Sequence, residues 1–118
     1  MKMQRVLSTY LFVNRKLNSA LIAEAAGAGV SAIELFCSRG HFDYRSAGDA
    51  RELGSWLAGN DLTLHSIHSP TTRDFQLSRE SGAPLSISDP ERLRRQEAVD
   101  EIKRALDMVE HIPFQYCI

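Results

Sequence analysis

Glu34 and His68 are polar residues in otherwise apolar segments, and both side chains could do chemistry there. Glu34 lies within the apolar segment Ile33–Phe36. An unpaired buried carboxylate is costly, so we expect Glu34 to meet a cation, a metal or hydrogen-bond donors. It can act as a general base or orient a substrate, and an internal ion pair is the structural alternative.

Two histidines lie in a second apolar segment, Leu62–His68. His68 is at the end of this segment, where a neutral imidazole can ligate a divalent metal or bind a hydroxyl group. A hydrogen-bonded structural role is the commoner one for a lone histidine. Strand alternation predicts that His65 faces the opposite side, so the two residues should not share one ion. His41 lies in a polar loop and is expected to be exposed, or to reach the mouth of a site.

Apolar segments alternate with segments of helical periodicity along the chain. This alternation predicts parallel strands joined by crossover helices. Strands are expected at 6–12, 32–37, 62–68 and 114–118. Helices are expected after Asn18, ending at Gly27 or Gly29, and after Ser46 or Asp49, ending at 59–60, with a third from Ser88 or Asp89 to Pro113.

The third helix has the strongest sequence signal. Pro90 fits its first turn, and Glu91 can form a capping box with Ser88. Its expected core-facing stripe is Leu93, Val99, Ile102, Leu106 and Val109. The long loop at 71–87 precedes it, and loops of this length are usually functional or mobile.

The composition fits one soluble globular domain over residues 1–118, with 43% hydrophobic and 25% charged residues. The formal net charge of −1 gives no field that would gather a polyanion, which argues against nucleic-acid binding. No apolar run approaches the roughly 20 residues that cross a bilayer, and no signal-peptide core is seen, so a cytoplasmic protein is expected. Cys37 and Cys117 lack CxxC spacing and are expected to be reduced packing residues.

A repeated strand-helix unit admits an open doubly wound sheet or a barrel. The turn after the first strand carries neither GxGxxG nor GxxxxGK[ST], so a nucleotide-binding sheet has no support. Composition alone does not choose between the remaining architectures.

Four short motifs, in this order and spacing, resemble the sugar phosphate isomerase/epimerase family. They are Leu7–Phe12, Ile33–Phe36, His41–Tyr44 and His65–Pro70. These proteins are xylose-isomerase-like TIM barrels, with apurinic-site endonucleases as distant relatives, and the resemblance covers essentially the whole chain. A full (β/α)₈ barrel takes about 250 residues. The expected fold is therefore α/β, an incomplete TIM barrel with three βα units and a fourth strand in a parallel sheet, the N-terminal half.

The resemblance implies an enzyme that interconverts epimers, or aldose and ketose forms, of a sugar or sugar phosphate. Such an enzyme uses a divalent metal (Mn, Mg, Co or Zn) to polarise an oxygen and paired carboxylates to move a proton. Glu34 would be catalytic, and in the endonuclease-like branch His68 would bind the metal. The expected substrate contacts are Tyr10, Phe12, His41 and His68.

The resemblance also places further ligands and carboxylates on later strands. Whether this chain is an enzyme by itself stays open, and negligible isomerase turnover is expected of the 118 residues alone. A non-catalytic half-barrel that self-associates, as a homodimer or higher oligomer, is the alternative, because an open half-barrel exposes sheet edges. An apurinic-endonuclease-like metal hydrolase shares His68 but conflicts with the charge balance.

Overall fold

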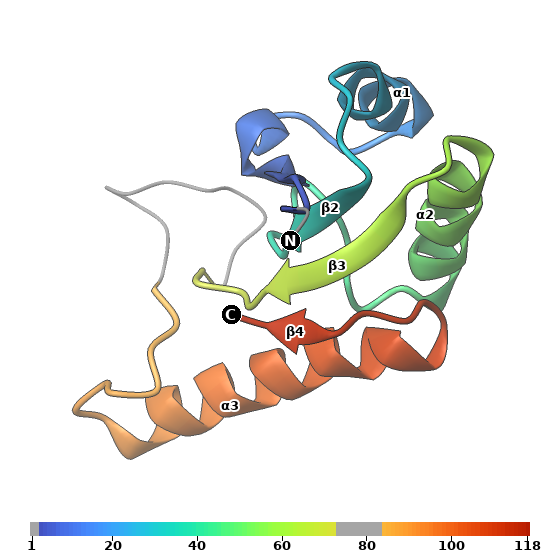
Figure 1. The fold of residues 1–118 in the computed structure, drawn as a ribbon. Coiled ribbons are helices and arrows are strands. Elements are labelled where there is room, and N and C mark those ends of the chain that lie inside the picture. Colours follow the sequence, from blue (N-terminus) through green and yellow to red (C-terminus); the bar gives the residue numbers. More distant parts are fainter. Residues whose placement is uncertain (1–2, 73–83) are drawn as a thin grey trace.

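A curved parallel sheet organises the computed structural model, which describes residues 3–72 and 84–118 (Figure 1). The strand order is β1-β2-β3-β4, so each strand lies beside its neighbour in sequence. The strands are β1 Val6–Ser8, β2 Ala32–Phe36, β3 Thr63–His68 and β4 Tyr116–Cys117. The α-helices are α1 Ser19–Gly27, α2 Ala47–Gly59 and α3 Arg92–Leu106, and the 3₁₀ helices are η1 Thr9–Phe12 and η2 Asp107–Glu110. The predicted α/β fold with a parallel sheet is confirmed.

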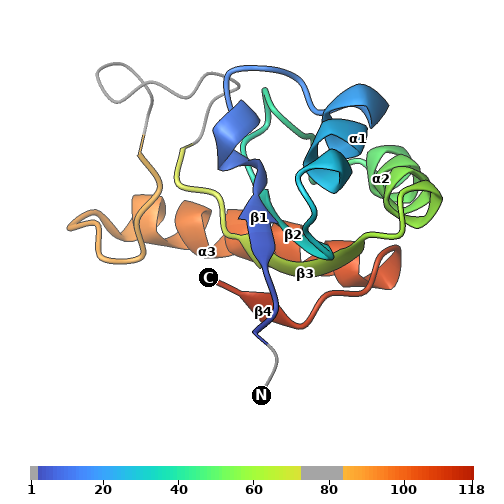
Figure 2. The ribbon, with the colours of Figure 1, turned by 45° about the horizontal axis from the view of Figure 1, so that its top comes forward.

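The α-helices cover one face of this sheet. Because crossovers between neighbouring parallel strands are right-handed, strands added in sequence order place their helices on the same side. Figure 2 shows the three α-helices outside the curved strands. Buried residues from the strands and helices accordingly form one core, which includes Ile22, Ile33, Leu35, Leu53, Leu57, Leu64, Ile67 and Ala105. We call the other face, which no described α-helix covers, the open face.

A register shift between β2 and β3 decides which side chains reach the open face. Ile33 pairs with Leu64, but Glu34 pairs with Ser66, so His65 is an extra residue in β3. Such a bulge shifts the alternation of side chains by one position. Leu64 and Ile67 therefore both lie in the helix-covered core, while Ser66 turns to the open face.

The first strand is shorter than predicted. Only Val6–Ser8 pairs with β2, and Thr9–Phe12 forms the 3₁₀ helix η1. Two side chains compete with the strand ladder here, because the Ser8 hydroxyl accepts the Tyr10 N–H at 3.2 Å and Thr9 Oγ1 accepts the Phe36 N–H at 2.9 Å. The prediction of a strand over residues 6–12 is therefore wrong beyond Ser8.

The ends of α1 and α2 follow the sequence signals. Asn18 caps α1, since its side-chain oxygen accepts the Leu21 N–H at 3.0 Å. Ser46 caps α2 by accepting the Asp49 N–H at 3.1 Å, which decides between the two predicted caps. After α1, Gly29 has a φ of 82°, a left-handed conformation that favours glycine.

The third helix departs from its predicted form at both its start and its packed face. It begins at Arg92, its N-cap Glu91 makes no side-chain capping bond, and the predicted capping box with Ser88 is not formed. Its buried residues are Ala98, Glu101 and Ala105. Most of the predicted stripe faces outward instead, with exposed fractions of 78% for Leu93, 39% for Val99, 38% for Leu106 and 52% for Val109, whereas Ile102 is half-buried.

Small side chains explain this rotation of α3. Alanines allow close approach to the core, and Glu101 turns inward to meet partners on the segment between β2 and α2. We call the exposed residues Val99, Leu106 and Val109 the α3 outer stripe. The predicted core stripe is therefore wrong.

The segment before α3 is described at its two ends. Thr72 and Pro84 form an antiparallel bridge, and the Leu85 N–H donates to the Thr71 carbonyl at 2.9 Å. Residues 73–83 of the predicted long loop lie outside the described residues. Within the described ranges, no helix has the length and apolar character that crossing a membrane requires.

Candidate functional site

Glu34 stands in a row of paired residues that crosses the open face. Ser8, Glu34, Ser66 and Tyr116, one from each strand, are in register. The Ser66 hydroxyl donates to Glu34 Oε2 at 2.7 Å, and Ser66 is fully buried whereas Glu34 is half-buried. The expectation that Glu34 meets a hydrogen-bond donor is confirmed. Among residues 3–72 and 84–118 no ion pair to Glu34 is seen.

His65 extends this row. Its Nδ1 lies 3.1 Å from Ser66 Oγ, and its ring centre lies 5.1 Å from that of Tyr116. Because the single Ser66 proton goes to Glu34, Nδ1 of His65 carries the proton of this second bond. The prediction that His65 faces away from the open side is wrong, since the bulge brings it next to Ser66.

His68 lies at the C-terminal end of β3 on the open face, paired with Phe36. Its Nδ1 lies 2.9 Å from the Ser69 carbonyl oxygen. A carbonyl only accepts, so Nδ1 carries the proton and Nε2 of the neutral ring keeps a lone pair. This anchoring is typical of metal-binding histidines.

A metal site needs more than this histidine. A divalent ion takes at least three protein ligands in such sites. In the part of the chain that the structure describes, no three His, Cys, Asp or Glu residues come together to hold an ion. The described donor set therefore does not fit a complete metal site.

Aromatic rings form a wall beside Glu34. The Phe36 ring centre lies 4.8 Å from that of His68 and 4.9 Å from that of Tyr10. Tyr10 is 45% exposed, so its ring and hydroxyl are accessible from the open side. Phe12, the other predicted aromatic contact, is half-buried and packs against the core beneath the helices. Tyr10 therefore belongs to the open face and Phe12 does not.

His41 is a structural residue in this conformation. Only 1% of it is exposed, its Nδ1 lies 2.7 Å from the Arg15 carbonyl, and its Nε2 lies 3.0 Å from Thr9 Oγ1. The carbonyl requires a proton on Nδ1, so Thr9 donates to Nε2 while accepting the Phe36 N–H. Burial lowers the pKa of His41, which favours this neutral form. The expectation of an exposed loop histidine is wrong, and neither nitrogen is free for a substrate.

A second carboxylate lies in the helix layer. Glu101 is buried and accepts the Tyr44 hydroxyl, and it forms ion pairs with Arg45 and, at 2.7 Å, with Arg104. Burial raises the pKa of the Tyr44 phenol, so that it stays a donor. This cluster attaches α3 to the segment that follows β2.

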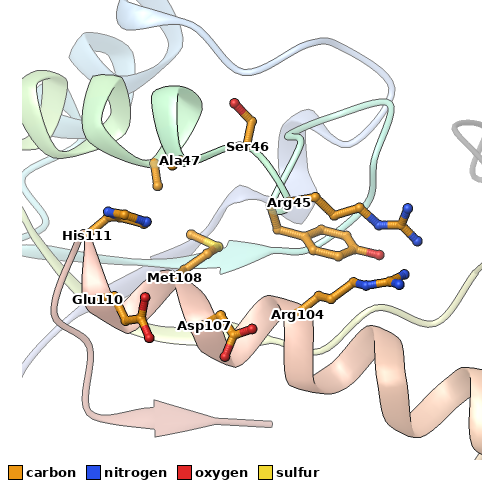
Figure 3. A pocket seen from close by; sticks show the side chains of 10 residues that line it. Arg45, Ser46, Ala47, Arg104, Asp107, Met108, Glu110 and His111 are labelled. Atoms are coloured by element: carbon orange, nitrogen blue, oxygen red, sulfur yellow. The ribbon is translucent and has the colours of Figure 1, made fainter.

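A hollow of about 410 Å³ lies next to this cluster, between the start of α2 and the end of α3. Figure 3 shows Arg45 and Arg104 on one side of it and Asp107, Glu110 and His111 along α3 and η2. Because both arginines are paired with Glu101 and two carboxylates line the same hollow, it has no net positive charge to offer an anion.

The cysteines carry no activated thiol. Both are free, with Cys37 buried and Cys117 exposed. Burial raises the pKa of the Cys37 thiol, and partial desolvation by its neighbours raises that of Cys117, so both stay protonated and weakly nucleophilic. The predicted packing role fits Cys37, whereas Cys117 lies exposed in β4.

The open face thus unites three of the predicted site residues, Glu34, His68 and Tyr10. Sequence reasoning did not assign four other residues to the site, and these are Phe36, His65, Ser66 and Tyr116. Phe36 lies two residues from Glu34, so strand alternation could have found it, whereas the bulge that turns Ser66 to this face leaves no local signal. Neither models of known protein families nor curated proteins yield a match to this chain.

Proposed function

We propose that the open face is the proton-transfer part of a sugar or sugar-phosphate isomerase/epimerase site, with Glu34 as the general base. The observation that carries the proposal is the state of this carboxylate. Within the described residues, Oε2 of Glu34 accepts the Ser66 hydroxyl while Oε1 accepts no hydrogen bond, and no cation neutralises the group. An oriented carboxylate with one available oxygen is what proton abstraction requires.

The reaction step follows from this arrangement. Oε1 of Glu34 takes the proton from the carbon next to the sugar carbonyl, and the electrons of the broken C–H bond move to the carbonyl oxygen, which forms an enediolate. Return of the proton to the neighbouring carbon, together with transfer of the remaining hydroxyl proton between the two enediolate oxygens, gives the isomer. Delivery of a proton to the opposite face of the original carbon gives the epimer. Ser66 holds Oε2 and so keeps the carboxylate in one orientation.

Two further groups support binding of a polyhydroxylated substrate. Nε2 of His68 can accept a hydrogen bond from a hydroxyl, because Nδ1 is held by Ser69. Tyr10 and Phe36 provide the apolar wall that small-molecule sites commonly place beside a few polar groups. His68, Tyr10 and Phe36 are thus proposed to bind and orient the substrate.

The nuclease alternative finds less support on this face. Holding the continuous phosphate backbone of a nucleic acid relies on several Lys and Arg side chains. The residues paired across the open face include neither, and they are Val6, Ser8, Ala32, Glu34, Phe36, Thr63, Ser66, His68 and Tyr116.

Hydrogen exchange with solvent tests the proposed base. We expect the chain to catalyse exchange of the hydrogen next to the carbonyl of at least one sugar in D₂O, measured by NMR on a panel of aldoses, ketoses and their phosphates. This half-reaction needs no full turnover. Glu34→Gln should slow exchange by about 10²- to 10⁴-fold, the usual contribution of a positioned base.

Glu24→Gln is the matched control, because Glu24 is an exposed glutamate on α1. It should exchange substrate hydrogens at the wild-type rate. Exchange no faster than in buffer across the whole panel, or equal rates for wild type and Glu34→Gln, would disprove the proposal.

A further inference from the structure

We infer that two copies of the chain close one eight-stranded barrel, with β4 of each copy paired to β1 of the other. This pairing follows from the sheet and its edges and does not depend on the proposed chemistry.

Both outer strands of the described sheet have a neighbour on one side only. β1 pairs with β2, and β4 pairs with β3. A free strand edge presents unpaired N–H and C=O groups, which favour pairing with another strand. The two edges of this sheet are therefore the places where a further strand is most needed.

The direction of the strands makes a second copy a suitable occupant. All four run parallel, so a two-fold axis along the strand direction leaves their direction unchanged in the second copy. β4 of one copy then meets β1 of the other in the parallel sense, and the same seam forms a second time by symmetry. Both edges of both copies are satisfied at once, so the assembly ends at two.

The number of strands and their curvature agree with this closure. Eight tilted strands close a barrel whose interior is filled by side chains or holds one small ligand, and parallel strands with helices outside form such a barrel. Each copy contributes four strands in sequence order, with the α-helices on the outer side of a curved wall (Figure 2).

Large apolar side chains lie where the seams and the interior would form. Tyr116, on the open face of β4, is 55% exposed, and Ile118, two residues further along and so on the same face, is 62% exposed. Tyr10 is 45% exposed on the same face, beside Phe36. Closure would cover all three.

The α3 outer stripe is the competing contact surface. Its Val99, Leu106 and Val109 are between 38% and 52% exposed. A helix surface has its backbone groups already paired, whereas β1 and β4 have backbone groups still to satisfy. We therefore assign the contact between copies to the strand edges.

Closure has one consequence for the site, which rests on the proposed function. In the order β1 to β4 followed by the same four strands of the second copy, the two β2 strands are four positions apart, on opposite sides of the ring. Glu34 of each copy would then face a shared interior, and one bound carbon would have a carboxylate on either side. Epimerisation needs proton donors or acceptors on both faces of the carbon.

The mass of the protein in solution tests the inference. Multi-angle light scattering of the wild type should give twice the 13.2 kDa chain mass. Tyr116→Lys, which puts an inward charge on an edge strand, should give the mass of one chain. Val109→Lys on the α3 outer stripe is the matched control, since Tyr116 and Val109 are 55% and 52% exposed, and it should stay dimeric.

Three results would overturn the inference. They are a wild type that stays monomeric at high concentration, a mass that keeps growing with concentration, and dissociation caused by Val109→Lys and not by Tyr116→Lys. Amide hydrogen exchange of the wild type adds a measurement that needs no variant. Amides of β1 and β4 should exchange more slowly in concentrated than in dilute samples, while amides of α3 should not change.

These results separate the two proposals. A dimer that exchanges no sugar hydrogen leaves the closed barrel in place and removes the proposed chemistry. A monomer that catalyses the exchange does the reverse.

Discussion

Glu34 and Glu101 are two carboxylates withdrawn from solvent and held in different ways. Glu101 lies in the helix layer and meets a phenol and two guanidinium groups, from Tyr44, Arg45 and Arg104. Glu34 lies on the open face and, within the described residues, meets the single hydroxyl of Ser66. A carboxylate surrounded by donors contributes to stability, whereas one with an available oxygen can take up a proton. Counting the partners of each group thus distinguishes a structural site from a chemical one.

The histidines repeat this contrast. Both ring nitrogens of His41 are hydrogen-bonded inside the fold, to Arg15 and Thr9. His68 is bonded at Nδ1 to the Ser69 carbonyl, and its Nε2 has no hydrogen bond among the described residues. Variants of the two carboxylates, of their neighbours and of the histidines test whether these roles differ.

The largest effect on stability is expected at Glu101. Glu101→Ala should lower the free energy of unfolding by about 2–4 kcal/mol in urea denaturation. We expect a smaller loss than for breaking a fully buried ion pair, because the Arg45 and Arg104 side chains are 34% and 52% exposed and can be solvated by water once Glu101 is removed. Glu34→Ala should cost about 1 kcal/mol, the value of one hydrogen bond. Equal losses at the two positions would contradict the comparison.

A smaller loss is expected from the Thr9 hydroxyl. Thr9→Val should lower the free energy of unfolding by about 1–3 kcal/mol, because it leaves the Phe36 N–H and His41 Nε2 buried without partners. Thr9→Ser keeps the hydroxyl and is the control. If valine and serine were equally tolerated in thermal or urea unfolding, the Thr9 bonds would not stabilise the fold.

The pH dependence of stability should reveal the neutral state of His41. Burial lowers its pKa in the folded state, so the unfolded chain binds a proton first as pH falls. This contribution is complete above about pH 6.5, the usual pKa of histidine, and is lost as pH drops below it. Urea unfolding at several pH values should show a weaker dependence in His41→Gln than in wild type. An equal pH dependence in His41→Gln and in wild type would contradict this prediction.

The smallest effect is expected at Ser66. Ser66→Ala removes the one donor to Glu34 and should change the free energy of unfolding by about 1 kcal/mol or less, because the half-buried carboxylate can bind water instead. Thermal unfolding measures this change. A loss of unfolding free energy as large as that of Glu101→Ala would mean that the bond between Ser66 and Glu34 holds the fold together. Glu34 would then have a structural role and not a catalytic one.

Local signals in the sequence predicted much of the fold. The apolar segments became parallel strands, Asn18 and Ser46 cap their helices, and Gly29 adopts the left-handed conformation after α1. These features depend on side chains a few residues apart, which is why they can be read from the sequence. The placement of Glu34 and His68 on strands was predicted in the same way.

Long-range packing decided the features that prediction missed. α3 presents Ala98, Ala105 and Glu101 to the core because small residues fit there and Glu101 finds donors on another segment. The apolar period alone favoured the opposite face.

By itself, the sequence determined the alternation of strands and helices, since apolar periodicity and caps act over a few residues. Which polar side chains have hydrogen-bond partners depends on the tertiary structure, because those partners come from chain segments far apart in the sequence. The bulge at His65 in β3 turns the Ser66 hydroxyl toward Glu34 and places the His65 ring next to Ser66. His41 is buried because it forms hydrogen bonds with Arg15 and Thr9, which lie 26 and 32 residues away in the sequence.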